Sequence, residues 1–267
     1  MLLLAERSDP VVDHALRFAV DLMEGGGGAF YRVAPDLTPY DYTLIGVPDK
    51  FHLCYLGGMN RHDPMTVRRL AARRRLVARF GAAGDLAPGA DYARYREFCG
   101  WLGVTDSIEL LFRDGERIFA GLNVAWGGGD VPPASAERNA EPLRAYIEFN
   151  LKRSGFAAGG AQPSLAGYGL TAREAEVAAQ LCGGRTNQEI GKRLGIGLAT
   201  VKTHLLRIFG KLGVENRAAA VALLAGCRDL AINRTVDCAG FEARHIPHAS
   251  HGAPRFAARG LMETSVS

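Results

Sequence analysis

The stretch Leu170–Leu224, LTAREAEVAAQLCGGRTNQEIGKRLGIGLATVKTHLLRIFGKLGVENRAAAVALL, determines most of what this sequence predicts. It holds two capping boxes, Thr171 with Glu174 and Thr186 with Glu189. In a capping box the threonine and the glutamate three residues later accept backbone N–H groups that the first turn of a helix leaves free. Two helices are therefore predicted to begin at these threonines.

Glycines divide the rest of this stretch. Gly183-Gly184 ends the first helix and Gly195 ends the second, because glycine adopts the left-handed conformation that commonly terminates a helix. A third helix is predicted over Leu198–Leu212 and a fourth over Asn216–Cys227. The segment is therefore expected to be a small all-α domain of four helices.

The third predicted helix has one apolar face and one basic face. At 100° per residue the apolar face must pack on the first two helices, which leaves the opposite face free. The apolar side chains are Val201, Leu205, Ile208 and Leu212, with Phe209 at the border. The free face carries Thr203 and Arg207, flanked by Lys202, Leu206 and Lys211. A helix with cations for phosphates and donors for base edges is suited to the major groove of DNA.

These residues also resemble the LuxR/NarL-type helix-turn-helix regulators. The matching positions are Leu170-Thr171, Arg173-Glu174, Glu176-Val177, Gly184, Thr186-Asn187, Glu189-Ile190, Leu194, Ile196, Thr200-Val201-Lys202, His204, Ile208, Lys211-Leu212, Val214, Asn216-Arg217 and Ala220-Val221. The resemblance implies a third helix that reads the major groove and a fourth helix that often pairs subunits. It implies DNA contacts from Thr200, Lys202, Thr203, His204, Leu206 and Arg207. It also implies backbone-contacting or positioning roles for Thr186, Asn187, Gln188, Lys211, Asn216 and Arg217.

Other interpretations of single features stay open. A basic helical face by itself is more often only solvated than bound to nucleic acid. His204 fits a packed or capping histidine as well as a DNA contact. The apolar run Ala219–Leu224 could be core alone, although its length on a terminal helix favours a subunit contact.

The chain of 267 residues has room for two ordinary domains. Residues 153–169 hold five glycines and a proline without an apolar period, which predicts a linker. Residues 165–228 hold 9 basic and 4 acidic side chains, whereas residues 1–164 hold 19 and 20. We therefore expect an α+β sensor domain over 1–152, a DNA-binding domain over 170–228 and a flexible tail over 229–267.

The first domain has the pattern of an antiparallel sheet covered by helices. Short strands are predicted over Ala29–Val33 and Tyr42–Val47, and a hairpin over Ile108–Phe112 and Arg117–Trp126, turning at Asp114-Gly115. Helices are predicted from Pro10 up to the glycines at 25–28, over Pro48–Gly57, Pro64–Ala78 and Asp91–Leu102, and over Ala134–Lys152, which contains Pro142. The expected fold is an α-β-α sandwich of the PAS or GAF general type, which commonly holds a ligand between sheet and helices.

Phe51, Tyr55 and Asp63-Pro64 resemble the pocket of the autoinducer-binding domains of LuxR-type quorum sensors. The resemblance implies that Tyr55 and Asp63 bind a polar head group. An apolar tail would then be surrounded by Phe51, Trp101, Phe119 and Trp126. The sequence departs from that pattern, since Phe51 replaces a tryptophan and Tyr55 to Asp63 is one residue shorter. The alternative is that the aromatic residues form core and that Asp63 only caps a helix beginning at Pro64.

Several other functions find no support in the sequence. The five cysteines are scattered without a C-x-x-C pair, which predicts neither a disulfide framework nor a zinc site and favours a reducing compartment. The trio His245, His248 and His251 lies in the expected tail, where no preformed metal site is predicted. No nucleophile–base pair or nucleotide-binding loop is recognisable, so we expect no catalytic residue and no cofactor. The opening residues lack a secretory signal pattern, and a cytoplasmic protein without a membrane span is expected.

Together these features predict a transcriptional regulator that binds double-stranded DNA as a homodimer on a two-fold operator. Its first domain would respond to a small molecule, and RNA polymerase is a further expected partner. Two alternatives stay open: a ligand-free regulator whose first domain mediates dimerisation or contact with a partner protein, and a small-molecule enzyme fused to a DNA anchor.

Overall fold

The computed structural model describes residues 9–158 and 170–224. The helices and strands within these ranges are α1 (Pro10–Leu22), β1 (Gly27–Val33), β2 (Pro39–Ile45), α2 (Asp49–Gly57), η1 (Met59–Arg61), α3 (Val67–Ala72), β3 (Val77–Arg79), η2 (Phe80–Ala82), α4 (Gly89–Trp101), β4 (Val104–Asp114), β5 (Arg117–Gly127), α5 (Ala134–Arg153), α6 (Ala172–Cys182), α7 (Asn187–Leu194), α8 (Leu198–Leu212) and α9 (Arg217–Leu224).

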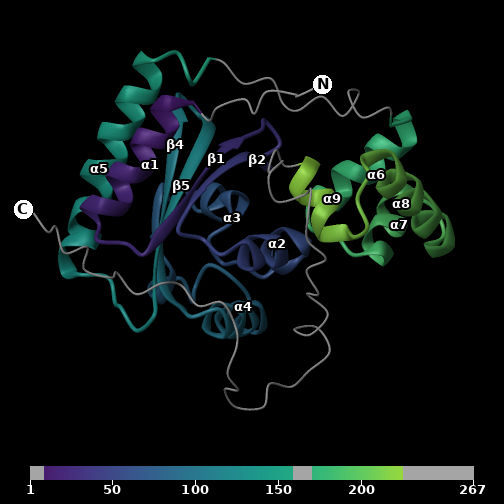
Figure 1. Ribbon diagram of the computed structural model, residues 1–267, viewed down its shortest axis with the longest axis horizontal. Coiled ribbons are helices and arrows are strands. Elements are labelled where there is room, and N and C mark those ends of the chain that lie inside the picture. The colour runs from purple at the N-terminus through teal and green to yellow at the C-terminus, as the bar shows by residue number, and fades with distance from the viewer. Residues whose placement is uncertain (1–8, 159–169, 225–267) are drawn as a thin grey trace, which may run out of the picture.

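The strands form one antiparallel five-stranded sheet in the order β2-β1-β5-β4-β3. Helices α1 and α5 lie on one face of this sheet and α2, α3 and α4 on the other (Figure 1). The DNA-binding helices predicted from the sequence, α6–α9, lie beyond α2 (Figure 1). The expected α+β fold, an α-β-α sandwich followed by four short helices, is confirmed.

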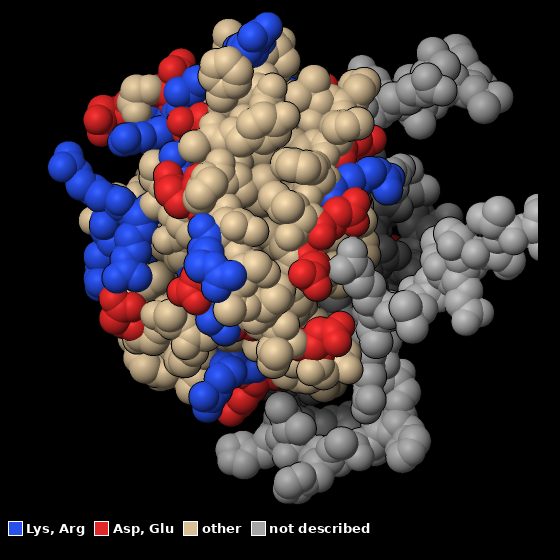
Figure 2. Space-filling model, turned by 90° about the vertical axis from the view of Figure 1, so that its left-hand side faces the viewer, with Lys and Arg blue, Asp and Glu red and all other residues tan. Residues whose placement is uncertain are grey.

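Alternation along the strands builds a separate core on each face of the sheet. Phe30, Ile108 and Leu122 face α1 and α5, where they pack with Leu16 and Ile147. The outer surface of α1 and α5 exposes large apolar side chains among scattered charges, and uncharged atoms fill its centre (Figure 2). These exposed side chains are Phe18, Leu22, Tyr146 and Phe149.

The other face of the sheet turns toward α2, α3 and α4, and it carries Tyr31. The Tyr31 ring crosses β5 at Gly121, where an added Cβ atom would lie 2.4 Å from the ring. Its hydroxyl group then donates a 2.5 Å hydrogen bond to Glu109 of β4. Glycine at position 121 is therefore what allows a tyrosine of β1 to reach an acid two strands away.

One predicted helix was wrong. The segment Pro64–Ala78, expected to be helical throughout, forms the short helix α3 and then the edge strand β3. Arg74 adopts a positive φ of 54° in the turn between them, and Val77 pairs with Leu110 of β4. Hydrogen bonding to the edge of β4 thus outweighs the helical preference of the sequence in this segment.

The last helix of the first domain is continuous. Helix α5 runs from Ala134 to Arg153 with Pro142 inside it, because its buried face, which includes Leu143 and Ile147, stays packed on the sheet. The first residue of the predicted linker, Arg153, is therefore still part of a helix. Residues 159–169 of the predicted linker lie outside the described residues. The predicted tail over 229–267 also lies outside them.

The four helices at the end of the described chain follow the sequence closely. Both predicted capping boxes form, at Thr171 and at Thr186, and α8 has the predicted bounds. The fourth helix is described as Arg217–Leu224, within the predicted Asn216–Cys227. Gly195 ends α7 with a φ of 65°, as expected of a glycine cap.

The position of these helices was not predicted. Helix α9 packs directly on α2, where Leu53 and Leu56 belong to one buried cluster with Ala218 and Val221. An added Cβ atom at Gly57 of α2 would lie 3.4 Å from the Ala218 side chain. The two parts of the chain therefore share an apolar interface in this arrangement.

The contact between Tyr31 and Gly121 gives a test of the fold. Gly121→Ala is expected to lower the free energy of unfolding by about 1–3 kcal/mol, because the new methyl group overlaps a ring that is held at both ends. Urea denaturation followed by circular dichroism measures this. The control is Gly100→Ala on α4, where an added Cβ meets open space. Helix propensity should make that change stabilising by about 0.5–1 kcal/mol. Equal effects of the two substitutions would contradict the described packing.

Candidate nucleic-acid interface and ligand cavity

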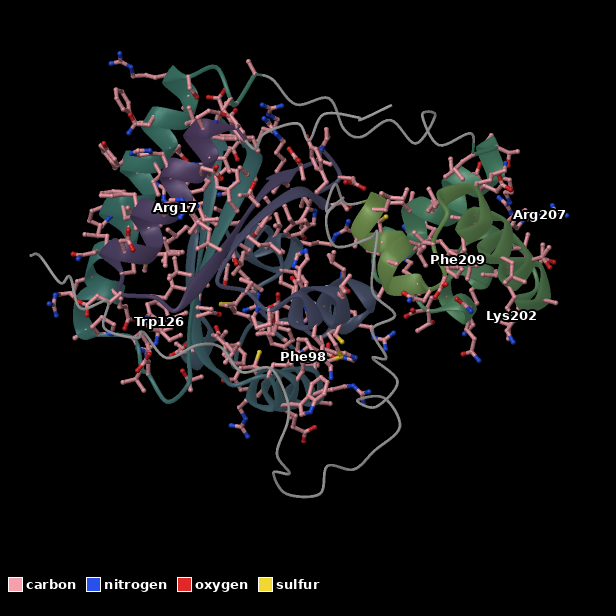
Figure 3. All side chains as sticks on the ribbon, in the orientation of Figure 1. Arg17, Phe98, Trp126, Lys202, Arg207 and Phe209 are labelled. Carbon is pink, nitrogen blue, oxygen red and sulfur yellow. The ribbon has the colours of Figure 1, made fainter. Side chains whose placement is uncertain are left out.

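The free face of α8 is as the sequence predicted. Val201, Leu205, Ile208 and Leu212 are buried. Lys202, Thr203, Leu206 and Arg207 are exposed. Leu206 shows 72% of its surface, which is unusual for a leucine with no partner on the described chain. Lys202 and Arg207 point away from the rest of the molecule (Figure 3). An exposed helix with cations along one side and an apolar side chain between them can lie in a major groove.

The other predicted DNA-contacting residues occupy mixed positions. Thr200 and Gln188 are exposed, and Asn187 is half-buried. Thr186 caps α7, where its hydroxyl group accepts the N–H of Glu189. His204 is half-buried, and its Nδ1 has no hydrogen-bond partner among the described residues. Both interpretations of His204 therefore stay open.

Three of the residues predicted to touch or position the DNA backbone make contacts within the protein. Lys211 Nζ lies 2.6 Å from Glu174 of the first capping box, whose pKa this contact lowers to about 2. The Asn216 side chain accepts the N–H of Ala219 at 2.9 Å and so caps α9. Arg217 donates to the carbonyl groups of Leu181, Arg185 and, across the interface, Gly57. A DNA contact by Arg217 would require it to leave these three acceptors.

A cavity of about 780 Å³ lies between the sheet, α2 and the DNA-binding helices. Its volume is within the range of about 300–1,000 Å³ usual for small-molecule sites. The sheet contributes side chains of β1, β4 and β5. Ala179 and Gln180 of α6 and Val221 and Leu224 of α9 complete the wall. The cavity therefore exists in this form only while the two parts of the chain are docked.

Asp63 and Tyr55, both predicted ligand-binding residues, meet in this cavity. Tyr55 donates a 2.8 Å hydrogen bond to Asp63 Oδ2, and the Met65 N–H donates to Oδ1 at 2.7 Å. Burial raises the pKa of Asp63 to about 6, although both hydrogen bonds lower it. Thr66, not Asp63, caps α3. The alternative that Asp63 only caps the following helix is therefore wrong.

A second buried acid in the cavity was missed by the sequence analysis. Glu109 of β4 is 6% exposed and accepts hydrogen bonds from Tyr31, at 2.5 Å, and from Asn123 Nδ2, at 3.0 Å. Burial raises the pKa of Glu109 to about 8, and the nearby charge of Asp63 also raises it. Its one sequence signal was the acidic residue inside the apolar run Ile108–Phe112, which a hairpin prediction alone does not explain.

The predicted apolar wall is only partly correct. Phe51 lines the cavity. Phe119 and Trp126 instead pack in the core under α1 and α5, on the opposite face of the sheet. Trp126 is labelled in Figure 3. Trp101 packs beside Phe98, with Lys50 Nζ 4.6 Å from its ring centre. The assignment of Trp101, Phe119 and Trp126 to the cavity wall was therefore wrong. Besides Phe51, the aromatic side chains that line the cavity are Tyr31, Tyr40, Tyr42, His52, Tyr55 and Tyr95.

The remaining chemistry of the described residues is limited. Within the described ranges, no helix combines the length and apolar character needed to cross a bilayer, and no three metal-ligating side chains gather. His245, His248 and His251 lie outside those ranges. Cys99 and Cys182 are free, whereas Cys54 is disulfide-bonded. Cys54 thus departs from the sequence analysis, which predicted no disulfide framework.

Comparison with known proteins adds the following. Residues 169–224 match the family described as bacterial regulatory proteins, luxR family. The monoamine regulon transcriptional regulator of Klebsiella aerogenes is 31% identical over 222 residues, which cover 83% of this chain and 93% of that protein. The probable transcriptional regulatory protein SgaR of Hyphomicrobium methylovorum is 57% identical over 54 residues, 20% of this chain and 26% of that protein. The crystal structure of Escherichia coli SdiA aligns with a TM-score of 0.42 and 17% identity, over 85% of this chain and 94% of that one.

The two buried acids predict how stability depends on pH. In the unfolded chain Glu109 ionises near pH 4.5, whereas in the folded chain it stays protonated up to about pH 8. Between these values the folded state binds more protons, so the free energy of unfolding falls as pH rises. Asp63, with a pKa raised from 3.8 to about 6, adds a fall of the same sign at lower pH.

Glu109→Gln should therefore reduce the loss of stability between pH 5 and pH 8 by about 1–3 kcal/mol. Urea denaturation at the two pH values measures it. Glu116→Gln, an exposed position in the turn of the same hairpin, serves as the control and should behave as wild type. An unchanged pH dependence in Glu109→Gln would show that this carboxyl group does not titrate abnormally.

Proposed function

The chain belongs to the luxR family of bacterial regulatory proteins and is a DNA-binding transcriptional regulator, and we propose that a small molecule in the shared cavity controls how it binds DNA. The observation that carries this proposal is the composition of the cavity wall. The sheet and α2 supply one part of it, and α6 and α9 of the DNA-binding helices supply another.

DNA recognition falls to the free face of α8. Lys202 and Arg207 supply positive charge for phosphates or base edges, and Thr203 and Leu206 lie between them on the same face. Lys192 and Arg193 of α7 are also exposed and extend the basic surface. Because Lys211, Asn216 and Arg217 are engaged within the protein, their part in binding is to hold α8 in place.

The docked interface couples ligand binding in the cavity to DNA binding by α8. A ligand that touches both walls binds the docked arrangement better than a separated one, and it therefore favours docking by that difference in affinity. Docking in turn fixes α8 relative to the sheet through α9 and the Arg217–Gly57 hydrogen bond. Ligand occupancy can thus set the geometry in which two recognition helices meet a two-fold operator.

The protein acts as a homodimer in this proposal. The apolar face of α9, which the sequence marked as a subunit contact, is covered by α2 of the same chain in the docked arrangement. The exposed apolar side chains of α1 and α5 offer a second copy another surface (Figure 2). Relatives of this chain are transcriptional regulators, so a regulatory role for the first domain is favoured over an enzymatic one.

The first test removes the cations of the recognition face. The double variant Lys202→Ala with Arg207→Ala should weaken binding to a DNA fragment selected by the wild-type protein by roughly 30-fold or more, since each contact contributes about 1–3 kcal/mol. The slope of log affinity against log salt should also fall by up to about 2. Fluorescence anisotropy measures both quantities. Arg138→Ala, an exposed cation on α5, is the matched control. Retained affinity in the double variant would overturn the assignment of α8.

The second test loosens the docked interface without changing the cavity wall. Leu53 is 1% exposed and belongs to the interface cluster but does not line the cavity. Leu53→Ala should weaken ligand binding at least several-fold and reduce the ligand-induced change in DNA affinity. The bound compound is first extracted from protein purified from its native host and identified by mass spectrometry.

Leu143→Ala on α5 controls for general destabilisation, because Leu143 is equally buried but lies on the opposite face of the sheet. Both truncations should cost about 2–5 kcal/mol of stability. Equal losses of ligand affinity in the two variants would mean that docking is not the coupled element. A chain purified without any bound compound that still binds DNA would favour a ligand-free regulator.

A further inference from the structure

Two buried carboxyl groups, those of Asp63 and Glu109, line the cavity. Asp63 and Glu109 are 7% and 6% exposed, and the hydrogen bonds that each accepts come from neutral groups. These donors are the Tyr55 hydroxyl and the Met65 N–H for Asp63, and the Tyr31 hydroxyl and the Asn123 amide for Glu109. Buried carboxylates are normally paired with a positive charge. Among the described residues, neither acid accepts a hydrogen bond from a positively charged group.

Among the described residues, no arginine that lines the cavity donates a hydrogen bond to Asp63 or Glu109. Arg69, whose charge lowers the pKa of Asp63, donates to Asp91 at 2.8 Å and to the carbonyl group of Arg61. Arg68 is exposed and donates to the carbonyl group of Asp36 at 2.8 Å. Arg185 and Arg193 belong to the DNA-binding helices, and the pKa of Arg185 is lowered chiefly by burial and then by the charge of Arg193. Glu109 lies on β4 of the sheet, and Asp63 lies in the turn between η1 and α3.

Aromatic rings surround the two acids. Tyr31, Tyr42, Phe51, Tyr55 and Tyr95 all line the cavity. The Phe51 and Tyr55 rings stack with their centres 6.5 Å apart, and Tyr31 and Tyr42 lie 5.4 Å apart. An aromatic face attracts a cation through its quadrupole, and the attraction grows when water is excluded. His52, also buried here, has a pKa lowered to about 3 by burial and so brings no positive charge of its own.

We propose that the ligand of this cavity is a small organic cation, a primary ammonium compound whose charged group binds Asp63 and Glu109 while its apolar body lies against the tyrosines. This inference rests on the proposed function only in using the same cavity. An ammonium group offers three donors, which suits two carboxylates that have remaining lone pairs. A neutral amide would leave the charge of ionised Asp63 uncompensated, and an anion would be repelled by that charge.

The proposal predicts proton release on binding. Free Glu109, with a pKa of about 8, is largely protonated at pH 7. The groups that face it are Asp63, Tyr31 of β1, Tyr55 of α2, Tyr95 of α4 and Asn123 of β5, and of these only Asp63 also titrates below pH 9. A bound ammonium group favours the ionised carboxylate, so the proton leaves to solvent as the cation enters.

The experiment is isothermal titration calorimetry on the full chain with n-hexylamine and 2-phenylethylamine, one aliphatic and one aromatic probe. The matched probes are n-hexanol and 2-phenylethanol, which are neutral, and 3-phenylpropionate, which is an anion. At least one amine should bind at least tenfold more tightly than its alcohol, and the anion should not bind. Titrations at pH 7 in two buffers of different ionisation enthalpy should show that up to one proton is released.

Glu109→Gln should lower the amine affinity at least tenfold and abolish most of the proton release, whereas Glu116→Gln should change neither. Asp63→Asn provides a second variant with the same expected loss of affinity. Circular dichroism establishes that each variant is folded. If Glu109→Gln does not fold, the proposal is tested by proton release on amine binding to the wild-type chain and by the amine affinity of Asp63→Asn.

The outcomes separate this inference from the proposed function. The proposal of a cationic ligand is overturned if neither amine binds at millimolar concentration, or if an amine and its alcohol bind with equal affinity. Binding of an amine without any change in DNA affinity supports the cation and contradicts control of DNA binding by the cavity. If a neutral compound binds the cavity and alters DNA affinity while the amines do not, the result supports the proposed function and contradicts the proposal of a cationic ligand.

Discussion

The packing of α9 on α2 is the contact on which the rest of this arrangement depends. Leu53 and Leu56 bury against Ala218 and Val221, and small side chains on α9 let the two helices approach closely. Arg217 adds a polar tie, since it joins carbonyl groups of both parts of the chain. Without this contact the cavity would lose one wall, and α8 would have no defined position relative to the sheet.

The sheet supplies the second constraint. Because side chains alternate along each strand, the same five strands build an apolar core under α1 and α5 and a polar, aromatic surface toward α2. Glu109 illustrates the result: its neighbours Ile108 and Leu110 are core, and its own side chain lines the cavity. Burial then raises its pKa to about 8. A buried titratable group is thus provided by one acidic residue within the apolar run Ile108–Phe112.

The sequence predicted the DNA-binding helices better than the cavity. Capping boxes and glycine stops act within a few residues, so Thr171, Thr186 and Gly195 marked helix ends that the structure confirms. Tyr55 and Asp63 lie eight residues apart, and the resemblance assigned both to one ligand site, whereas their hydrogen bond to each other appears only in the structure. Trp126 was misplaced because a strand residue faces either side of a sheet, and an apolar run such as the one preceding it does not reveal which side.

By itself the sequence determined the α+β class, the four short helices and the exposed face of α8, since each follows from local caps, turns and periodicity. Only the tertiary structure decided that β3 forms, that Glu109 joins Asp63, and that the DNA-binding helices dock on α2 to close the cavity. Those features depend on contacts between residues far apart in the chain. Burial and pairing at such distances are set by the packing of whole elements, which no local pattern encodes.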